Sequence, residues 1–229
     1  MNLKRHIPNT ITCLNLLSGC VGVTLAIEGS YYGVACCVAL SALFDFLDGF
    51  MARLLGAYSP MGKELDSLAD LVSFGLAPAL LVMYGLRLSL PVGLAWLAYA
   101  ALLIPVFSAL RLAKFNIDTR QTHSFIGLPV PADALWWIGV CHAFASGVAL
   151  PLWQTVCVLL SIILFSYLMV SEIPMFSLKF SSYGWRENAV RYTLLGIAVA
   201  MLLWLGLAGL APVIGLYILL SLWQWKRAA

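Results

Sequence analysis

Long apolar runs dominate this sequence and restrict the folds that it can adopt. Runs of about 17–23 residues alternate with short polar or Gly/Pro breaks, and a membrane-spanning helix needs about 20 such residues. Hydrophobic residues fill 62% of the 229 positions and charged residues 10%, whereas soluble domains carry about 25% charged residues. The sequence therefore predicts an all-α integral membrane protein, a polytopic helical bundle with one membrane-embedded domain over 1–229.

The apolar runs predict about eight transmembrane helices. They cover residues 10–27, 31–53, 62–84, 92–113, 130–149, 152–170, 189–206 and 208–225. Because the last two runs are short, six spans followed by a re-entrant tail is the alternative count. Residues 1–9 are polar and include Pro8, and we expect them to form a short interfacial segment before the first span. Pro78 and Pro105 lie inside apolar runs and predict kinks.

Most positive charges fall in five clusters between the predicted spans. The clusters comprise Lys4, Arg5, Arg53, Lys63, Arg111, Lys114, Arg120, Lys179, Arg186, Arg191, Lys226 and Arg227. With eight spans, all five clusters would share one side of the membrane, and the positive-inside rule makes that side cytoplasmic. Both termini are then cytoplasmic too. No basic domain or stripe lies outside the apolar runs, so nothing indicates nucleic-acid binding.

Four aspartates stand out against this apolar background. Four of the six aspartates in the chain lie within residues 45–70, and an aspartate near a bilayer centre costs roughly 2.5–3.5 kcal/mol on insertion scales. The pattern is Asp45-x2-Asp48-Gly49-x2-Ala52-Arg53-x8-Gly62-x3-Asp66-x3-Asp70. Such a cluster needs cations, polar ligands or water to offset its cost, and it therefore indicates a functional site.

The spacing predicts that the four carboxylates converge. Asp45 and Asp48 are three residues apart and Asp66 and Asp70 four, so each pair lies on one face of its helix. Asp45 and Asp70, the two ends of the motif, each lie about 12 Å from the cytoplasmic ends of two adjoining antiparallel helices. Like charges this close cannot all ionise unaided, and hard divalent cations are suitable partners. We expect a two-metal site that binds a pyrophosphate.

The neighbours of the aspartates are consistent with a bound phosphate ligand. Gly49 and Ala52 have almost no side chain and leave room for a ligand against the helix backbone. Arg53 and Lys63 stand at the ends of the two helices, where they could hold phosphate oxygens. A purely structural aspartate–arginine pairing and cation or proton transport are the alternatives.

The aspartate motif resembles the signature of the CDP-alcohol phosphotransferase family at every position. The resemblance implies two divalent cations, Mg²⁺ or Mn²⁺ with Ca²⁺ possible, bound by Asp45, Asp48, Asp66 and Asp70 around a CDP-linked lipid. It also implies that Asp70 is the general base for the incoming alcohol, and that the protein is a homodimer. We assign CDP-lipid binding to Asn9, Thr12, Asn15, Gly49, Ala52, Arg53, Ser59, Gly62 and Lys63.

Three further segments resemble the bacterial phosphatidylserine synthases within this family. Residues 7–19 match a PNxxTxxNxxxG opening, residues 66–78 match DSLADxVSFGxAP, and residues 111–116 and 125–131 are similar to RLARFN and FxGLPxP. The resemblance implies that the protein transfers a phosphatidyl group from CDP-diacylglycerol to L-serine and releases CMP. It also implies a bacterial cytoplasmic (inner) membrane and an active site that faces the cytoplasm.

The acceptor site is predicted at the cytoplasmic end of the fourth span. Serine is a zwitterion, and Arg111, Lys114 and Asn116 cluster there, so we assign them to serine or phosphate binding. Ordinary positive-inside anchoring is the alternative for this cluster. Lys114 replaces the arginine that is usual in the family, which keeps the charge but loses bidentate geometry. Glu172 is expected to be a solvated loop residue.

Two other functions remain open at this point. The same chemistry could use another acceptor, namely glycerol-3-phosphate, an inositol phosphate or choline. A phosphorylated acceptor would need more basic residues than Arg111 and Lys114 provide. A function of another class, a cation- or proton-coupled transporter, would use the aspartates for ion passage.

Overall fold

The computed structural model describes residues 3–118, 125–176 and 184–228 of the chain, almost all of them helical. The elements are α1 (Leu3–Ile27), α2 (Tyr31–Leu54), α3 (Pro60–Asp70), η1 (Leu71–Leu76), α4 (Ala77–Ser89), η2 (Val92–Leu102), α5 (Leu103–Ile117), β1 (Phe125–Ile126), α6 (Val130–Cys141), η3 (His142–Phe144), α7 (Leu152–Val170), β2 (Pro174–Met175), α8 (Trp185–Leu205), η4 (Gly206–Gly209) and α9 (Leu210–Ala228). The prediction of an all-α polytopic bundle is confirmed.

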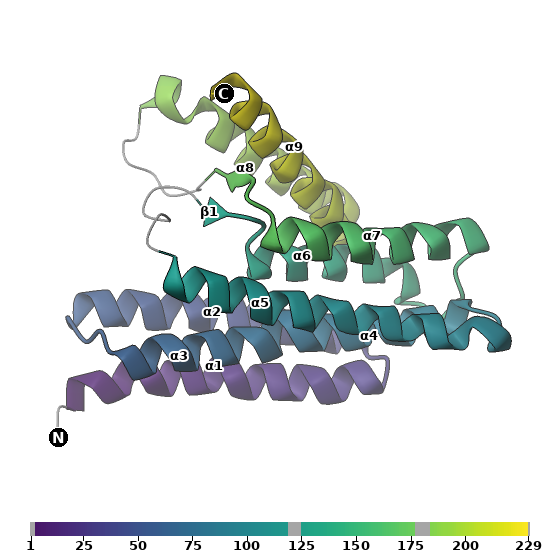
Figure 1. The fold of residues 1–229 in the computed structure, drawn as a ribbon, viewed down its shortest axis with the longest axis horizontal. Coiled ribbons are helices and arrows are strands. Elements are labelled where there is room, and N and C mark those ends of the chain that lie inside the picture. Colours follow the sequence, from purple (N-terminus) through teal and green to yellow (C-terminus); the bar gives the residue numbers. More distant parts are fainter. Residues whose placement is uncertain (1–2, 119–124, 177–183, 229) are drawn as a thin grey trace.

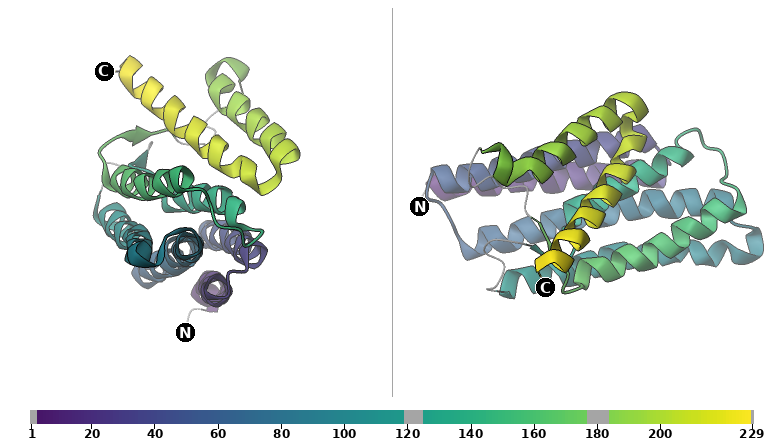
Figure 2. Two further views of the ribbon diagram at one scale, coloured as in Figure 1. Left: turned by 90° about the vertical axis from the view of Figure 1, so that its right-hand side faces the viewer. Right: turned by 90° about the horizontal axis from the view of Figure 1, so that it is seen from above.

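The bundle has two parts. Helices α1 to α7 run roughly along one axis, whereas α9 crosses them obliquely (Figures 1 and 2). Helices α8 and α9 form a hairpin that packs on α6, on the opposite side of the bundle from α1. Helix α1 packs along α2 and α3, and this contact brings the polar residues of α1 to the aspartates.

Six stretches are long and apolar enough to cross a membrane. They are His6–Ile27, Tyr31–Leu54, Pro60–Ser89, Val92–Ile117, Leu152–Val170 and Asn188–Arg227. The last stretch holds both α8 and α9, which fold back on each other. The predicted span 130–149 corresponds to α6, whose 12 residues extend only about 18 Å. The count of eight spans therefore stays a prediction.

The N-terminal segment differs from the prediction. Residues 3–9 do not form a separate element, because α1 begins at Leu3 and continues through Pro8. A proline this close to the start of a helix removes few backbone hydrogen bonds. Parts of the predicted basic clusters lie outside the described residues. They are Arg120, Lys179 and the side chains of Lys4, Arg5 and Arg186.

The two internal prolines coincide with changes of helix type. The π-helical segment η1 ends at Leu76, just before Pro78, and the 3₁₀-helical segment η2 ends at Leu102, just before Pro105. A proline has no N–H for the regular helical bond and its ring crowds the preceding turn. The winding therefore changes near both prolines, and the kinks themselves stay a prediction.

Two glycines allow the C-terminal hairpin to form and to pack. Gly206 adopts a positive φ of 59° at the end of α8, a conformation that favours glycine. Gly139 on α6 lies against the backbone of Ala211 on α9, where a Cβ atom would clash. Small residues of this kind permit close approach of helices in membranes.

A short strand pair joins two connections near the end of α5. In β1 and β2, Phe125 pairs with Met175 and Ile126 with Pro174, antiparallel. The N–H of Gly127 also donates to the carbonyl of Ile173 at 2.9 Å. The segment after α7 is thereby fixed beside the segment that leads into α6.

Candidate active site

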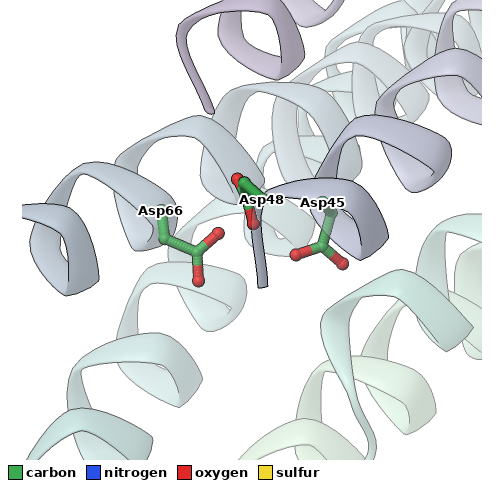
Figure 3. Close-up of side chains that lie close together, drawn as sticks. All are labelled: Asp45, Asp48 and Asp66. Carbon is green, nitrogen blue, oxygen red and sulfur yellow. The ribbon is translucent and has the colours of Figure 1, made fainter. Parts of the chain in front are cut away.

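Three of the four motif aspartates come together between α2 and α3. One carboxylate oxygen from each of Asp45, Asp48 and Asp66 lies within 4.8 Å of the others, and Figure 3 shows the Asp66 carboxylate directed towards the other two. Asp45 and Asp48 share one face of α2, as the spacing predicted. Asp48 is buried and the other two are half-buried. The structure therefore contains a compact, largely enclosed carboxylate group.

Asp70 lies outside this group. It follows Asp66 by one helical turn on α3, a rise of about 6 Å, and is buried. Its Oδ1 accepts a hydrogen bond from Asn15 Nδ2 at 3.2 Å. The sequence predicted that four carboxylates converge at one depth. In the structure three of them do, and Asp70 lies one helical turn away.

Helix α1 fixes the orientation of two of the carboxylates. The Thr12 hydroxyl donates to Asp48 Oδ2 at 2.6 Å, and Asn15 donates to Asp70. Asn15 is itself held, because the Ser73 hydroxyl donates to its side-chain oxygen at 2.7 Å. Thr12 and Asn15 were predicted to bind the CDP-lipid. In the structure they contact the aspartates, an arrangement typical of residues that orient metal ligands.

The carboxylate group has the donor set of a hard divalent cation. Asp66 Oδ1 is buried and has no hydrogen-bond partner among the described residues, and a buried carboxylate oxygen without a partner is costly. Clustered carboxylate oxygens are the ligands that Mg²⁺, Mn²⁺ and Ca²⁺ prefer. Asp45, Asp48 and Asp66 therefore fit a bound cation.

A cavity of about 480 Å³ adjoins the carboxylate group. Residues of α1, α2, α3 and the connection between α2 and α3 line it: Pro8, Asn9, Thr12, Asp48, Gly49, Ala52, Ala57, Tyr58, Ser59, Pro60, Gly62, Lys63 and Asp66. Two of the residues assigned to CDP-lipid binding, Asn15 and Arg53, do not line the cavity. Asn15 is buried beside Asp70, and Arg53 is exposed. The sequence thus predicted most of this lining, but not Pro8, Ala57, Tyr58 or Pro60.

Two features of the cavity lining suit a phosphate ligand. No heavy atom lies within 4 Å of the position that a Cβ of Gly49 would occupy among the described residues, so the α2 backbone is open to the cavity. Helix α3 begins there: Ser59 caps it by accepting from the Gly62 N–H at 3.0 Å, and Pro60 is its first residue. A helix N-terminus attracts anions, and the lysine that follows, Lys63, adds a positive charge.

The three residues predicted to bind the acceptor do not converge. Arg111 is buried, lies over the Phe115 ring at 4.9 Å and interacts electrostatically with Asp70. The Asn116 side chain donates to the Ser67 hydroxyl at 2.9 Å. The backbone carbonyl of Asn116 accepts from Lys63 Nζ at 2.6 Å. None of the three predicted residues lines the cavity. Within the described part of the chain, Arg111 is the one of the three that has an electrostatic interaction with a motif aspartate.

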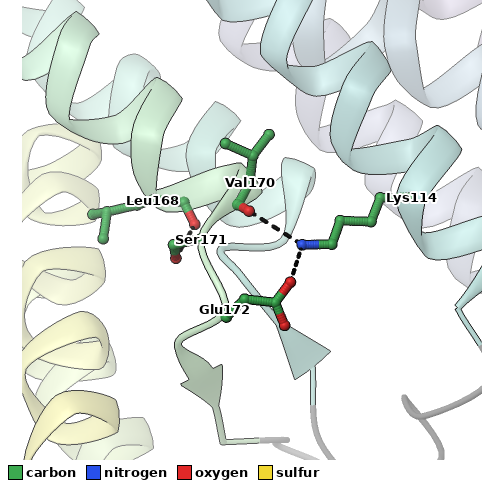
Figure 4. A network of polar contacts seen from close by, with 5 residues as sticks. All are labelled: Lys114, Leu168, Val170, Ser171 and Glu172. Atoms are coloured by element: carbon green, nitrogen blue, oxygen red, sulfur yellow. Dashed lines mark hydrogen bonds and ion pairs between the residues drawn. The ribbon is translucent and has the colours of Figure 1, made fainter.

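Lys114 is held by the segment at the end of α7. It forms an ion pair with Glu172 and donates to the Val170 carbonyl at 3.3 Å (Figure 4). Glu172 was expected to be a solvated loop residue. It is exposed, but it holds Lys114. The pairing joins the end of α5 to the segment after α7.

Two buried polar residues, Ser73 and Asp133, have roles that were not predicted from the sequence. Ser73 follows Asp70 by three residues, a spacing that places both on one helix face. Asp133 on α6 is fully buried and accepts from Trp137 Nε1 at 3.0 Å. Its sequence signal was an aspartate inside an apolar run with a tryptophan four residues later.

The comparisons with known proteins agree with this geometry. Residues 5–141 match the model of the CDP-alcohol phosphatidyltransferase family, and the chain belongs to this family. The match includes all four motif aspartates and ends at the last residue of α6, so α7, α8 and α9 lie beyond it.

Several relatives carry the name CDP-diacylglycerol–serine O-phosphatidyltransferase. The protein of that name from Mycobacterium leprae is 38% identical over 207 residues, which cover 85% of this chain and 66% of the relative. The protein from Helicobacter pylori strain 26695 is 33% identical, and the match covers 95% of this chain and 90% of the relative. The protein from Bacillus subtilis is 35% identical, and the match covers 73% of this chain and 88% of the relative. The chain thus spans slightly less than two thirds of the M. leprae protein.

Proposed function

We propose that this protein transfers the phosphatidyl group of CDP-diacylglycerol to L-serine, giving phosphatidylserine and CMP. The observation that carries the proposal is the Asp45, Asp48 and Asp66 group beside a cavity that opens on Gly49 and the start of α3. The names of the relatives support serine as the acceptor.

The donor binds in the cavity between α1, α2 and α3 in this proposal. The pyrophosphate lies near the N-terminus of α3 and Lys63, and the open backbone at Gly49 accommodates the nucleotide. Asp45, Asp48 and Asp66 would hold the divalent cations, two of Mg²⁺ or Mn²⁺, with Asp70 as a further ligand. When bound, such cations neutralise the pyrophosphate and stabilise the charge that develops on the leaving group.

Asp70 accepts the proton from the serine hydroxyl in this proposal. The serine oxygen forms a bond to the lipid-side phosphorus, the bond from that phosphorus to the bridging oxygen breaks, and the electron pair leaves on CMP. Asn15 engages Asp70 Oδ1, which leaves Oδ2 for the proton. Arg111, which interacts with Asp70, binds the serine carboxylate beside the base.

The protein works within the bilayer, and the lipid tails of donor and product stay among the helices. We propose that the cavity faces the cytoplasm, since Lys63 and Arg53 lie beside it and basic residues favour that side. The inner membrane, the cytoplasmic termini, the single domain and the homodimer remain predictions.

An acceptor assay tests the proposal. Purified protein receives CDP-diacylglycerol, Mg²⁺ or Mn²⁺, and in turn L-serine, glycerol-3-phosphate, an inositol phosphate or choline, and CMP release is measured. We expect release that depends on both metal and serine. No serine-dependent release with either metal would contradict the proposal, and release with another acceptor would reassign the substrate. Solute flux in liposomes without CDP-lipid chemistry would indicate a transporter.

A further inference from the structure

A buried polar cluster lies behind Asp70, where α1, α2 and η1 meet. Its members are Asn15, Ser41 and Ser73, one from each of these helices, and each is at most 1% exposed. Burying such groups costs free energy unless hydrogen bonds satisfy them. None of the three lines the donor cavity, so contact with a ligand in that cavity does not explain why they lie inside an apolar bundle.

Asn15 joins Asp70 to Ser73. Its Nδ2 donates to Asp70 Oδ1 at 3.2 Å, and its Oδ1 accepts from the Ser73 hydroxyl at 2.7 Å. A side-chain amide has a donor end and an acceptor end. A hydroxyl that donates to the oxygen therefore keeps the nitrogen end turned towards the carboxylate.

Close packing of α1 on η1 allows this contact. Gly19 lies one turn after Asn15 on α1, and a Cβ atom at Gly19 would clash with the hydroxyl and the backbone of Ser73. A glycine at this position lets the two helices approach each other closely. The Ser73 hydroxyl is thereby held within reach of the Asn15 amide.

Ser41 contacts the same asparagine in a different way. Its hydroxyl donates to the backbone carbonyl of Asn15 at 3.4 Å, a long hydrogen bond to a group whose direction α1 already fixes. The Ser73 hydroxyl lies 3.1 Å from this carbonyl, but its shorter contact is with the side-chain oxygen. Ser73 thus contacts the amide group that reaches Asp70, whereas Ser41 contacts the backbone.

We propose that Ser73 is a positioning residue that acts through the Asn15 amide to hold the Asp70 carboxylate in the direction needed to accept the proton of the acceptor hydroxyl. The inference rests on the proposed function, because it assumes that Asp70 is the base. The bond at Oδ1 fixes the rotation of the carboxylate and so presents Oδ2. Without the Ser73 hydroxyl, the buried amide oxygen loses this partner, and the amide is free to turn its oxygen towards Asp70, where two acceptors cannot bond to each other.

Steady-state kinetics of Ser73→Ala at saturating Mn²⁺ test this inference. The kcat per CDP-diacylglycerol binding site, with the sites counted by calorimetry, should fall about tenfold, the effect of one hydrogen bond. The KM for serine and the affinity for CDP-diacylglycerol should stay within about twofold, because Ser73 does not line the donor cavity. Counting the binding sites removes the contribution of misfolded protein, so a purely structural role would leave this kcat unchanged.

Two further variants serve as control and as substitute. Ser41→Ala removes an equally buried hydroxyl from the same asparagine and should leave kcat within about twofold. Ser73→Cys keeps the size of the side chain but only a weak donor. Its kcat should lie between those of wild type and Ser73→Ala, and this variant decides the test if Ser73→Ala does not bind the lipid. Equal losses in Ser73→Ala and Ser41→Ala would overturn the inference, and so would a wild-type kcat in the Ser73 variants.

A double-mutant cycle with Asn15→Leu tests whether Ser73 acts through Asn15. Once the amide is gone, Ser73→Ala should lower kcat by less than about twofold more. A further tenfold loss in the Asn15→Leu background would overturn the inference.

The wild-type protein separates this inference from the proposed function. If wild-type protein shows serine-dependent CMP release and Ser73→Ala has the same kcat, the inference alone is wrong. If wild-type protein shows no such release with either metal, the proposed function is wrong and the inference falls with it.

Discussion

The proposed donor side (the cavity between α1, α2 and α3) and the proposed acceptor side (Arg111, Lys114 and Asn116) are built differently. On the donor side, residues of α1, α2 and α3 surround one cavity beside three carboxylates, all within residues 8–66. On the acceptor side, Arg111, Lys114 and Asn116 are neighbours on α5, but Lys114 pairs with Glu172 and Asn116 donates to Ser67, whereas Arg111 interacts electrostatically with Asp70. Helical spacing within two adjoining helices therefore positions the residues of the proposed donor side. Contacts between residues far apart in the sequence position those of the proposed acceptor side.

Asp66→Asn should have the largest effect, because it removes the negative charge of a carboxylate whose buried Oδ1 has no hydrogen-bond partner among the described residues. We expect metal-dependent CMP release to fall at least about a thousandfold, since a bound cation supplies several kcal/mol to such a reaction. The control is Glu64→Gln, an exposed acid on the same helix, which should retain activity. Activity of Asp66→Asn within twofold of wild type would remove Asp66 from the metal site.

Asp70→Asn should separate binding from turnover. Loss of the proton acceptor should reduce CMP release about a hundredfold or more, while the binding of CDP-diacylglycerol, measured by calorimetry, stays largely intact. The amide keeps the size of the side chain and an oxygen that can accept from Asn15. Full activity of this variant would rule out Asp70 as the base.

Thr12→Val tests the support that α1 gives to the donor side. The variant removes the 2.6 Å hydrogen bond to Asp48, and we expect the metal concentration for half-maximal activity to rise about tenfold. The matched control is Thr10→Val, since the exposed Thr10 hydroxyl donates only to the His6 carbonyl in the described part of the chain. Equal effects of the two variants would mean that the Thr12 bond does not orient Asp48.

Lys114→Gln should have the smallest effect. Its ion pair with Glu172 is partly exposed, and such pairs contribute about 0–1 kcal/mol. The KM for serine should change by less than about threefold, whereas Arg111→Lys should raise it about tenfold. If Lys114→Gln raised the KM for serine as much as Arg111→Lys does, Lys114 would belong to the acceptor site after all.

The sequence predicted the donor side well because that side depends on local periodicity. Asp45, Asp48 and Asp66 meet because spacings of three residues and a short connection place them on facing helix surfaces. Gly49 and Ser59 were likewise assigned from the motif, and both line the cavity.

The sequence predicted the acceptor side less well because that side depends on distant contacts. Lys114 pairs with Glu172, a residue 58 positions away, and no periodicity indicates such a contact. The contact from Ser73 to Asn15 likewise joins residues 58 positions apart. The continuous start of α1 and the short α6 also escaped prediction, because hydropathy locates apolar runs and not the ends of helices.

The separation of the proposed donor and acceptor sides is tested most directly by measuring how CDP-diacylglycerol binds to purified Asp66→Asn and Arg111→Lys, with and without Mn²⁺. Calorimetry on both variants and on wild type gives the comparison. Wild type and Arg111→Lys should bind the lipid with the same Mn²⁺-dependent affinity, and Asp66→Asn should lose the dependence on Mn²⁺. Mn²⁺-dependent binding that survives in Asp66→Asn, or that is lost in Arg111→Lys, would contradict this separation.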